Sequence, residues 1–183
     1  MTIYWVRMGS SGSEVAVHAG IASLSRGEKI VCRTTRGLEF GTVLCESTTA
    51  DPSETARFVK HAEPSDELLW SNLLDLSRDA AHSCQEYLNL HGLDDILLDV
   101  EPLFDGRTLF FHFLGEPSAT VTERIADLLQ VYQQSVAMSP FAKKVEAGCG
   151  PNCGTSSKSG CGTKGGCTAC VVSHKCRTSA PSP

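Results

Sequence analysis

Two kinds of hydrophobic spacing follow one another along the chain, and each predicts a different type of secondary structure. In the N-terminal part, short β-rich runs at residues 3–8 and 57–61 flank a hairpin pattern over 28–46, with Arg36-Gly37 as its turn. Gly37 and Gly41 favour a positive φ or a bulge. We therefore expect this hairpin to curl like the corner of a small barrel.

The spacing then becomes helical. Ser65 is the predicted N-cap of a first helix, because Asp66 and Glu67 follow it in a first turn that suits the helix dipole. Apolar residues recur every three or four positions up to a stop at Gly92. Two strands at 96–104 and 108–114 come next, joined by an Asp-Gly turn that is typical of a hairpin.

A second helix completes this pattern. Thr120 and Glu123 have the spacing of a capping box and predict a helix to about residue 134, with Ile125, Leu128, Leu129 and Tyr132 facing inward. The order of elements predicts an α+β fold: a β-rich N-terminal lobe, then a helix–hairpin–helix unit with an antiparallel sheet.

The composition changes sharply near residue 147. Residues 147–183 are rich in Gly, Ser, Thr and Cys, contain no aromatic residue, and cannot build a hydrophobic core. We therefore divide the chain into an α+β domain over 1–146 and a cysteine-rich tail over 147–183, either disordered or folded around bound metal.

Charge separates the same two parts. The net charge is −5, and all 21 acidic residues lie within 1–146, whereas the tail carries four basic residues and no acidic one. An acidic body is a poor match for a phosphate backbone, so we expect contact with RNA to be indirect. The apolar stretches are short, and residues 1–20 do not resemble a secretory signal. These features predict a cytoplasmic protein that does not bind membranes.

Six of the nine cysteines crowd into the tail, at Cys149, Cys153, Cys161, Cys167, Cys170 and Cys176. Thiolates are the donors that zinc and iron–sulfur clusters prefer, and short glycine-rich gaps let several sulfurs turn toward one centre. The spacing predicts a metal-binding tail that holds an iron–sulfur cluster or zinc, and does not choose between them.

Two other functions fit the tail. Cys167 and Cys170 could exchange disulfides as a thiol redox pair, although the segment that follows them is short and β-prone for the helix that such sites use. The tail could instead bind RNA directly, as a zinc-knuckle-like module.

The body offers weaker candidates. Arg36 and Glu39 either present charges to a partner or are solvated residues of a hairpin turn. Asp99 and Glu101 lie two apart on a strand and most simply mark its solvent face, with Leu98 and Val100 facing the core. Spacing identifies no catalytic triad, P-loop or dinucleotide motif, so we expect no catalytic residues and no enzyme.

The three body cysteines are expected to be structural. Cys84 falls on the apolar face of the first helix, where a small buried thiol packs well. Cys32 and Cys45 lie on the two arms of the predicted hairpin and could approach each other.

Three segments of the body and one of the tail resemble a known family. Residues 35–41 (TRGLEFG), 91–93 (HGL) and 98–106 (LDVEPLFDG) are similar to motifs of the PSP1 C-terminal domain family of bacteria, whose members include YaaT-type sporulation-associated regulators. The glycine-rich segment 148–154 is similar to the family's C-terminal motif, although an adjacent Cys-Cys pair of that motif is absent.

This resemblance implies a function that spacing alone does not. It implies a non-enzymatic regulator that acts in a complex with small helical partner proteins, carries iron–sulfur clusters and influences mRNA processing by a ribonuclease complex. On this basis Arg36 and Glu39 are expected to bind a partner.

Overall fold

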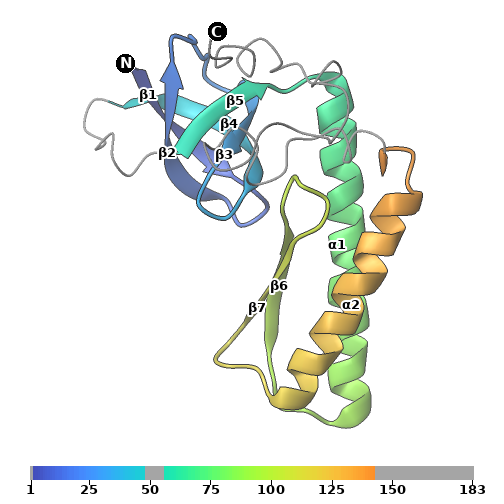
Figure 1. The fold of residues 1–183 in the computed structure, drawn as a ribbon. Coiled ribbons are helices and arrows are strands. Elements are labelled where there is room, and N and C mark those ends of the chain that lie inside the picture. The colour runs from blue at the N-terminus through green and yellow to red at the C-terminus, as the bar shows by residue number, and fades with distance from the viewer. Residues whose placement is uncertain (1, 48–55, 143–183) are drawn as a thin grey trace, which may run out of the picture.

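The computed structural model describes residues 2–47 and 56–142. They form a small β-barrel and, beside it, a long unit of two helices and a β-hairpin (Figure 1). In chain order the elements are β1 (Thr2–Met8), β2 (Ser13–Gly20), β3 (Lys29–Arg33), β4 (Leu38–Ser47), β5 (Ala56–His61), α1 (Pro64–His91), β6 (Leu97–Pro102), β7 (Leu109–Phe113) and α2 (Ala119–Met138). The expected α+β class and β-rich N-terminal region are confirmed.

The first five strands close into a barrel in the order β1-β2-β5-β3-β4, and β4 pairs back onto β1. The predicted hairpin is β3 and β4, and it curls into the barrel as expected. Gly41 permits this curvature, because a Cβ there would lie 2.6 Å from Val6 Cγ1 and 3.0 Å from the carbonyl oxygen of Arg7. Closure pairs every strand on both sides, which removes the exposed sheet edges of an open sheet.

Strand β2 was not predicted from the sequence. Its sequence, SEVAVHAG, contains two alanines and a glycine, which have little intrinsic strand preference. Its pairing with β1 along seven positions and its parallel contact with β5 define the strand instead. Long-range pairing therefore decides its structure.

The first helix begins two residues earlier than predicted. Glu63, not Ser65, is the N-cap, and Pro64 occupies the first turn. The Asp66 carboxylate accepts a hydrogen bond from the Glu63 backbone N–H at 2.9 Å, which completes a reciprocal capping box between these two residues. The helix ends as expected at Gly92, which adopts the left-handed conformation with φ 59°.

The second helix also has a different cap. Ser118 is the N-cap, so the predicted Thr120–Glu123 box does not start this helix. Asp95, from the loop before β6, accepts hydrogen bonds from the Ser118 backbone N–H at 2.8 Å and from its hydroxyl at 2.9 Å. A residue distant in sequence therefore sets the beginning of α2, while Leu128 and Tyr132 are buried as predicted.

One hydrophobic core joins the barrel to the helical unit. Phe40 of β4 stacks on Trp70 of α1 with ring centroids 5.6 Å apart, and lies 5.7 Å from the ring of Phe104 after β6. Buried Leu73 of α1 and Tyr132 of α2 belong to the same cluster. The barrel has a second cluster inside it, which includes Val6, Met8, Val17, Ile30 and Val43.

Candidate functional site: a charged joint between barrel and hairpin

The turn between β3 and β4 projects Arg36 toward the β6–β7 hairpin. The Thr34 backbone N–H donates to the Gly37 carbonyl oxygen at 2.9 Å, and the Arg36 N–H donates to the Thr34 hydroxyl at 3.1 Å. Gly37 has φ 143°, and a Cβ there would lie only 3.0 Å from a methyl carbon of Leu103. Glycine therefore lets the turn pack closely against the end of the hairpin.

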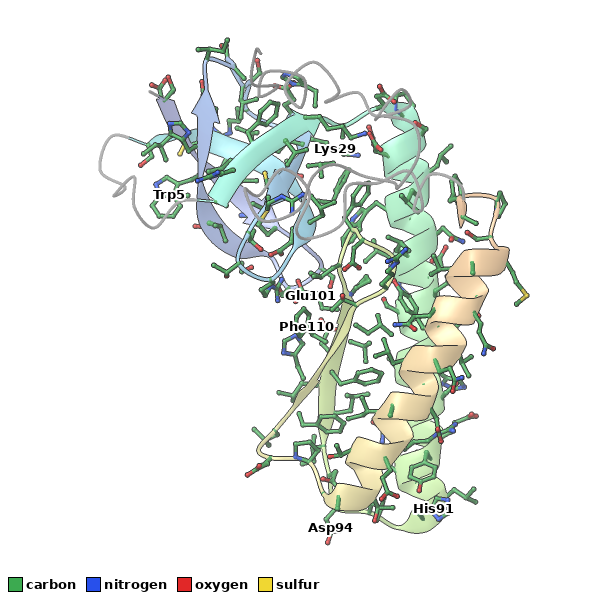
Figure 2. All side chains as sticks on the ribbon, viewed as in Figure 1. Trp5, Lys29, His91, Asp94, Glu101 and Phe110 are labelled. Carbon is green, nitrogen blue, oxygen red and sulfur yellow. The ribbon has the colours of Figure 1, made fainter. Side chains whose placement is uncertain are left out.

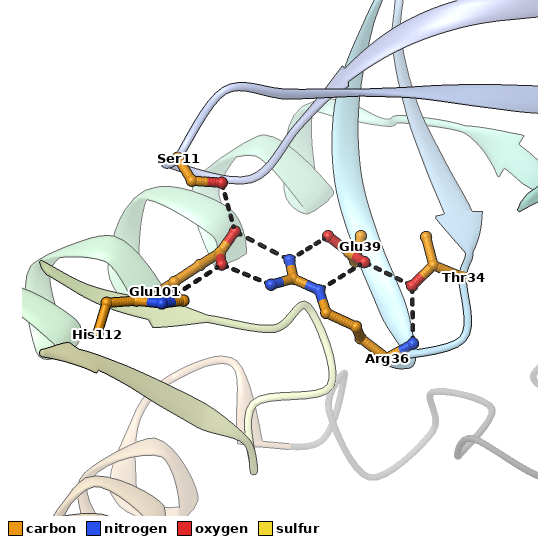
Figure 3. Close-up of polar contacts among 6 residues, drawn as sticks. All are labelled: Ser11, Thr34, Arg36, Glu39, Glu101 and His112. Carbon is orange, nitrogen blue, oxygen red and sulfur yellow. Dashed lines mark hydrogen bonds and ion pairs between the residues drawn. The ribbon is translucent and has the colours of Figure 1, made fainter. Parts of the chain in front are cut away.

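The Arg36 guanidinium binds two carboxylates from different parts of the chain (Figure 3). It donates to Glu101 of β6, at 2.7 Å from Nη1 and 3.0 Å from Nη2. It also donates to Glu39 of β4, at 2.7 Å from Nη2 and 3.2 Å from Nε. Both carboxylates are buried, with exposed fractions of 1% for Glu101 and 4% for Glu39. The planar guanidinium suits this double bidentate geometry, which a lysine could not reproduce.

Smaller contacts complete what we call the Arg36 joint, made of Ser11, Thr34, Arg36, Glu39, Glu101 and His112 (Figure 3). The Ser11 hydroxyl donates to Glu101 at 3.2 Å, and the Thr34 hydroxyl donates to Glu39 at 2.5 Å. His112 Nε2 lies 3.5 Å from the Glu101 carboxylate. Every carboxylate oxygen in the joint therefore faces at least one donor.

The aromatic ring of Phe110 and the backbone at Gly9 fix the surroundings of the joint. The Arg36 guanidinium lies over the Phe110 ring, 5.0 Å from its centroid, in a cation–π arrangement. Gly9, in the β1–β2 turn with φ 57°, comes so close to Glu101 that a Cβ would lie 2.2 Å from Oε1. The β1–β2 turn of the barrel is therefore in close contact with the buried Glu101 carboxylate of the hairpin.

Electrostatics favour the charged forms of Glu101 and Arg36. Burial opposes the charged form of Glu101, but hydrogen bonds from Arg36 and its positive charge outweigh burial and leave the pKa of Glu101 below its ordinary value. Hydrogen bonds to Glu101 and then to Glu39 raise the pKa of Arg36, which stays protonated at any physiological pH. The joint therefore combines one guanidinium with two buried carboxylates.

The structure changes how two predicted pairs are understood. Arg36 and Glu39 do lie at a turn, but Glu39 is buried, so they are not a pair of solvated turn residues. The expectation that Glu101 lies on the wet face was wrong, as was the inward orientation of Leu98, which is 62% exposed. The register shifts between Leu97 and Asp99, which moves Leu98 outward, and Arg36 compensates the buried charge of Glu101.

Sequence patterns indicated only part of this joint. Ser11, Phe110 and His112 were not predicted to contribute, because nothing in their local sequence shows that they meet Arg36. The contact between Arg36 and Glu101 spans 65 positions. Two of the motifs that carried the family resemblance, at residues 35–41 and 98–106, contact each other here. That resemblance was the one sequence signal that pointed to these residues.

The cysteine predictions have different outcomes. Cys84 is buried on α1 as expected. Cys32 and Cys45 are not cross-strand neighbours. In the strand register, Cys32 lies opposite Glu39 and Cys45 lies opposite Trp5, and both thiols are free. Cys32 is buried, and this desolvation raises the pKa of its thiol.

The predicted metal ligands Cys149, Cys153, Cys161, Cys167, Cys170 and Cys176 lie outside the described residues. Between residues 2 and 47 and between 56 and 142, no three His, Cys, Asp or Glu side chains gather in a way that could hold a metal ion. In the same part of the chain, neither helix has an apolar stretch of the length needed to cross a bilayer.

Comparison with known proteins confirms the family resemblance. Residues 56–140 match the model of the PSP1 C-terminal conserved region. The chain is also 26% identical over 133 residues to the Stage 0 sporulation protein YaaT of Bacillus subtilis (strain 168), a match that covers 68% of this chain. The chain spans about half the length of that relative, since 48% of it is covered. No solved structure matches the chain significantly.

The matched region begins with a strand of the barrel, since its first strand is β5, which lies between β2 and β3. It includes Glu101 and His112 but not Arg36 or Glu39. The Arg36 joint therefore connects the matched residues to the strands that precede them.

Proposed function

We propose that this chain is a non-enzymatic regulatory adaptor that acts by binding protein partners, and through them contributes to RNA processing. Its tail cysteines would hold an iron–sulfur cluster or zinc. The observation that carries the adaptor part is the Arg36 joint. Its charged motif residues contact one another and fix the barrel against the hairpin.

This use of the motif residues favours a scaffold over a reaction centre. A general base or a cation ligand needs free lone pairs that face a substrate or an ion. In the joint, the oxygens of Glu39 and Glu101 face Arg36, Thr34 and Ser11 instead. A rigid connection between two modules is what an adaptor needs in order to present both to a partner in a fixed orientation.

The metal proposal rests on the donor set. Six thiols within a short glycine-rich tail match the soft anionic ligands that zinc and iron–sulfur clusters require. When bound, such a centre would supply folding energy to a segment that has no hydrophobic core of its own. Metal occupancy would then create a docking surface, and metal loss or oxidation would remove it.

Metal analysis of the full chain tests this proposal. The untagged protein would be purified without oxygen and analysed for iron, acid-labile sulfide and zinc together with its ultraviolet–visible spectrum. The quadruple Cys→Ser variant at 149, 153, 167 and 170 should lose the metal. The matched control is Cys45→Ser, because Cys45 is an exposed free thiol of the body.

Partner binding is compared on the same two variants. Proteins that co-purify with the chain from the source organism should be recovered in smaller amounts with the quadruple variant and in unchanged amounts with Cys45→Ser. If both metal content and partner recovery stay unchanged in the quadruple variant, the proposed mechanism is wrong. Disulfide reductase activity that requires Cys167 and Cys170 would replace it with a thiol redox enzyme.

A further inference from the structure

The β6–β7 hairpin has two faces, and only one of them contacts the helices. Val100 and Leu109 belong to the core shared with α1 and α2, and Leu97 and Phe111 pack against that core. Residues on the opposite face point away from the helices, as Phe110 does in Figure 2. We call this opposite side the outer face of the hairpin: Ile96, Leu98, Asp99, Glu101, Phe110, His112 and Leu114.

The outer face carries large apolar side chains that no described residue covers. Ile96, Leu98 and Leu114 are 53%, 62% and 67% exposed. They lie close together, because the Leu114 N–H donates to the Ile96 carbonyl oxygen at 2.9 Å and Leu98 is two residues further along the strand. Three exposed aliphatic side chains grouped at this end of the hairpin favour a surface for interaction over scattered exposure.

Carboxylates surround this patch. Asp94, Asp99 and Glu116 are all exposed, in the loop before β6, on β6 and in the loop after β7. The hairpin's one basic residue, Arg107, lies in the β6–β7 turn, at the opposite end from Asp94 and Glu116, and residues 92–106 and 108–123 contain no lysine or arginine. His112 pairs across the strands with Asp99. The surface is therefore apolar at its centre and negative at its rim.

We propose that this outer face binds a basic amphipathic peptide segment of a partner protein, in which apolar side chains alternate with lysine or arginine. The apolar side chains would cover Ile96, Leu98 and Leu114, and the cations would pair with the surrounding carboxylates. A second copy of this chain is disfavoured, because it would bring like charges together. The inference rests on the proposed adaptor function and assigns its surface and the partner's chemistry.

The Arg36 joint sets the position of this surface. Glu101 and Phe110 lie on the same face as the patch and are held by Arg36. The barrel is therefore fixed at one end of the outer face, and the apolar patch lies toward the other end, near the Asp94 position labelled in Figure 2. This arrangement gives the peptide a preformed surface that needs no ordering when it binds.

The test measures binding of a fluorescent synthetic peptide of alternating Leu and Lys to the full chain, by anisotropy at several salt concentrations. A peptide of Leu and Glu in the same order is the matched control. The Leu/Lys peptide should bind, more weakly as salt increases, and the Leu/Glu peptide should not. Backbone NMR shifts should locate the bound peptide on β6 and β7.

Variants separate this surface from general attraction to an acidic protein. Leu98→Ser and the double change Asp99→Asn with Glu116→Gln should each weaken peptide binding about tenfold, the effect of losing a central interface contact. Leu68→Ser is the matched control, since Leu68 of α1 is 61% exposed. Asp79→Asn on exposed α1 controls for charge. Both controls should bind normally, and circular dichroism should show that all variants are folded.

Three results would overturn the proposal: no binding of the Leu/Lys peptide, equal weakening by the controls, or chemical cross-links that place the chain's own basic residues 147–183 on this face. None of them depends on metal content. If peptide binding fails while partner recovery still depends on metal, the proposed surface is rejected and the adaptor function stands. If the peptide binds as expected but partner recovery does not depend on metal, only the metal mechanism is rejected.

Discussion

Two of the ion-pair contacts between the described barrel and the helical unit involve buried carboxylates, and they differ in how many such carboxylates each cation serves. In the Arg36 joint, one guanidinium serves Glu39 and Glu101, which come from opposite sides of the interface. In the second, which we call the Lys60 joint, Lys60 of β5 lies 2.6 Å from the fully buried Asp66 of α1. The Asp66 carboxylate also accepts a hydrogen bond from the Glu63 backbone N–H, so Lys60 is one of at least two donors to it.

This difference predicts unequal dependence on the two cations. Removing a cation from a buried pair leaves an uncompensated charge, which costs far more than the intact pair contributes. Loss of Arg36 would leave two buried carboxylates without their counterion, each keeping a hydroxyl donor, from Thr34 or Ser11. Loss of Lys60 would leave one such carboxylate, which keeps a backbone donor. The Arg36 joint should therefore be the more fragile connection.

The largest effect is expected from Arg36→Met, which removes the charge and keeps an unbranched side chain. It should lower the free energy of unfolding by about 3–5 kcal/mol, because Glu39 and Glu101 lose their shared counterion. Urea denaturation followed by circular dichroism measures this. The control is Arg78→Met, because Arg78 pairs with Asp75 on the surface with 72% of its side chain exposed. Its loss should cost less than ~1 kcal/mol. Equal effects would mean that the Arg36 joint contributes no more than a surface pair.

The next largest effect is expected at Gly9, whose absent side chain leaves room for Glu101. Gly9→Ala should cost ~1–2 kcal/mol for the left-handed backbone and a further ~1–3 kcal/mol for the collision with Oε1. Gly20→Ala is the control, because Gly20 has φ 65° and no atom within 4 Å of a Cβ. Thermal unfolding of both variants isolates the collision. If the two variants lose the same stability, Glu101 yields to the new side chain without cost.

A smaller loss is expected from Lys60→Met in the Lys60 joint. The buried Asp66 carboxylate would lose one donor but keep the Glu63 N–H, so we expect a cost of about 1–3 kcal/mol. Urea denaturation of this variant beside Arg36→Met compares the two joints directly. A loss larger than that of Arg36→Met would reverse the ranking of the joints.

The smallest effect is the dependence of stability on acid pH. The pKa of Glu101 lies below its ordinary value of 4.5 in the folded chain, so its ionised form stabilises the fold above that value. This contribution should decline as the pH falls below 4.5 and through the folded pKa. Glu101→Gln should therefore lose part of the acid dependence measured by urea denaturation from pH 6 to pH 3. Glu86→Gln on exposed α1 should follow the unchanged protein, and identical curves for both variants would contradict the assignment.

The sequence predicted most elements because their signals are local. The apolar period of α1 and its stop at Gly92 lie within the helix itself, and the β3–β4 and β6–β7 hairpins are indicated by their turn residues. Strand β2 and the two helix caps were not predicted correctly. Strand β2 depends on its pairing with β1, and the α2 cap depends on Asp95, both of which are distant in sequence. The α1 cap is a local box between Glu63 and Asp66, and the prediction placed it two residues too late.

By itself, then, the sequence determined the α+β class, the two hairpins, the helical faces and the resemblance to the PSP1 family, since each follows from periodicity or a contiguous motif. Tertiary structure alone decided that the barrel closes, that Glu101 is buried and that Leu98 faces outward. The physical reason is that a buried carboxylate is stable only beside a compensating cation. For Glu101 that cation is Arg36, 65 positions away and brought near by the fold.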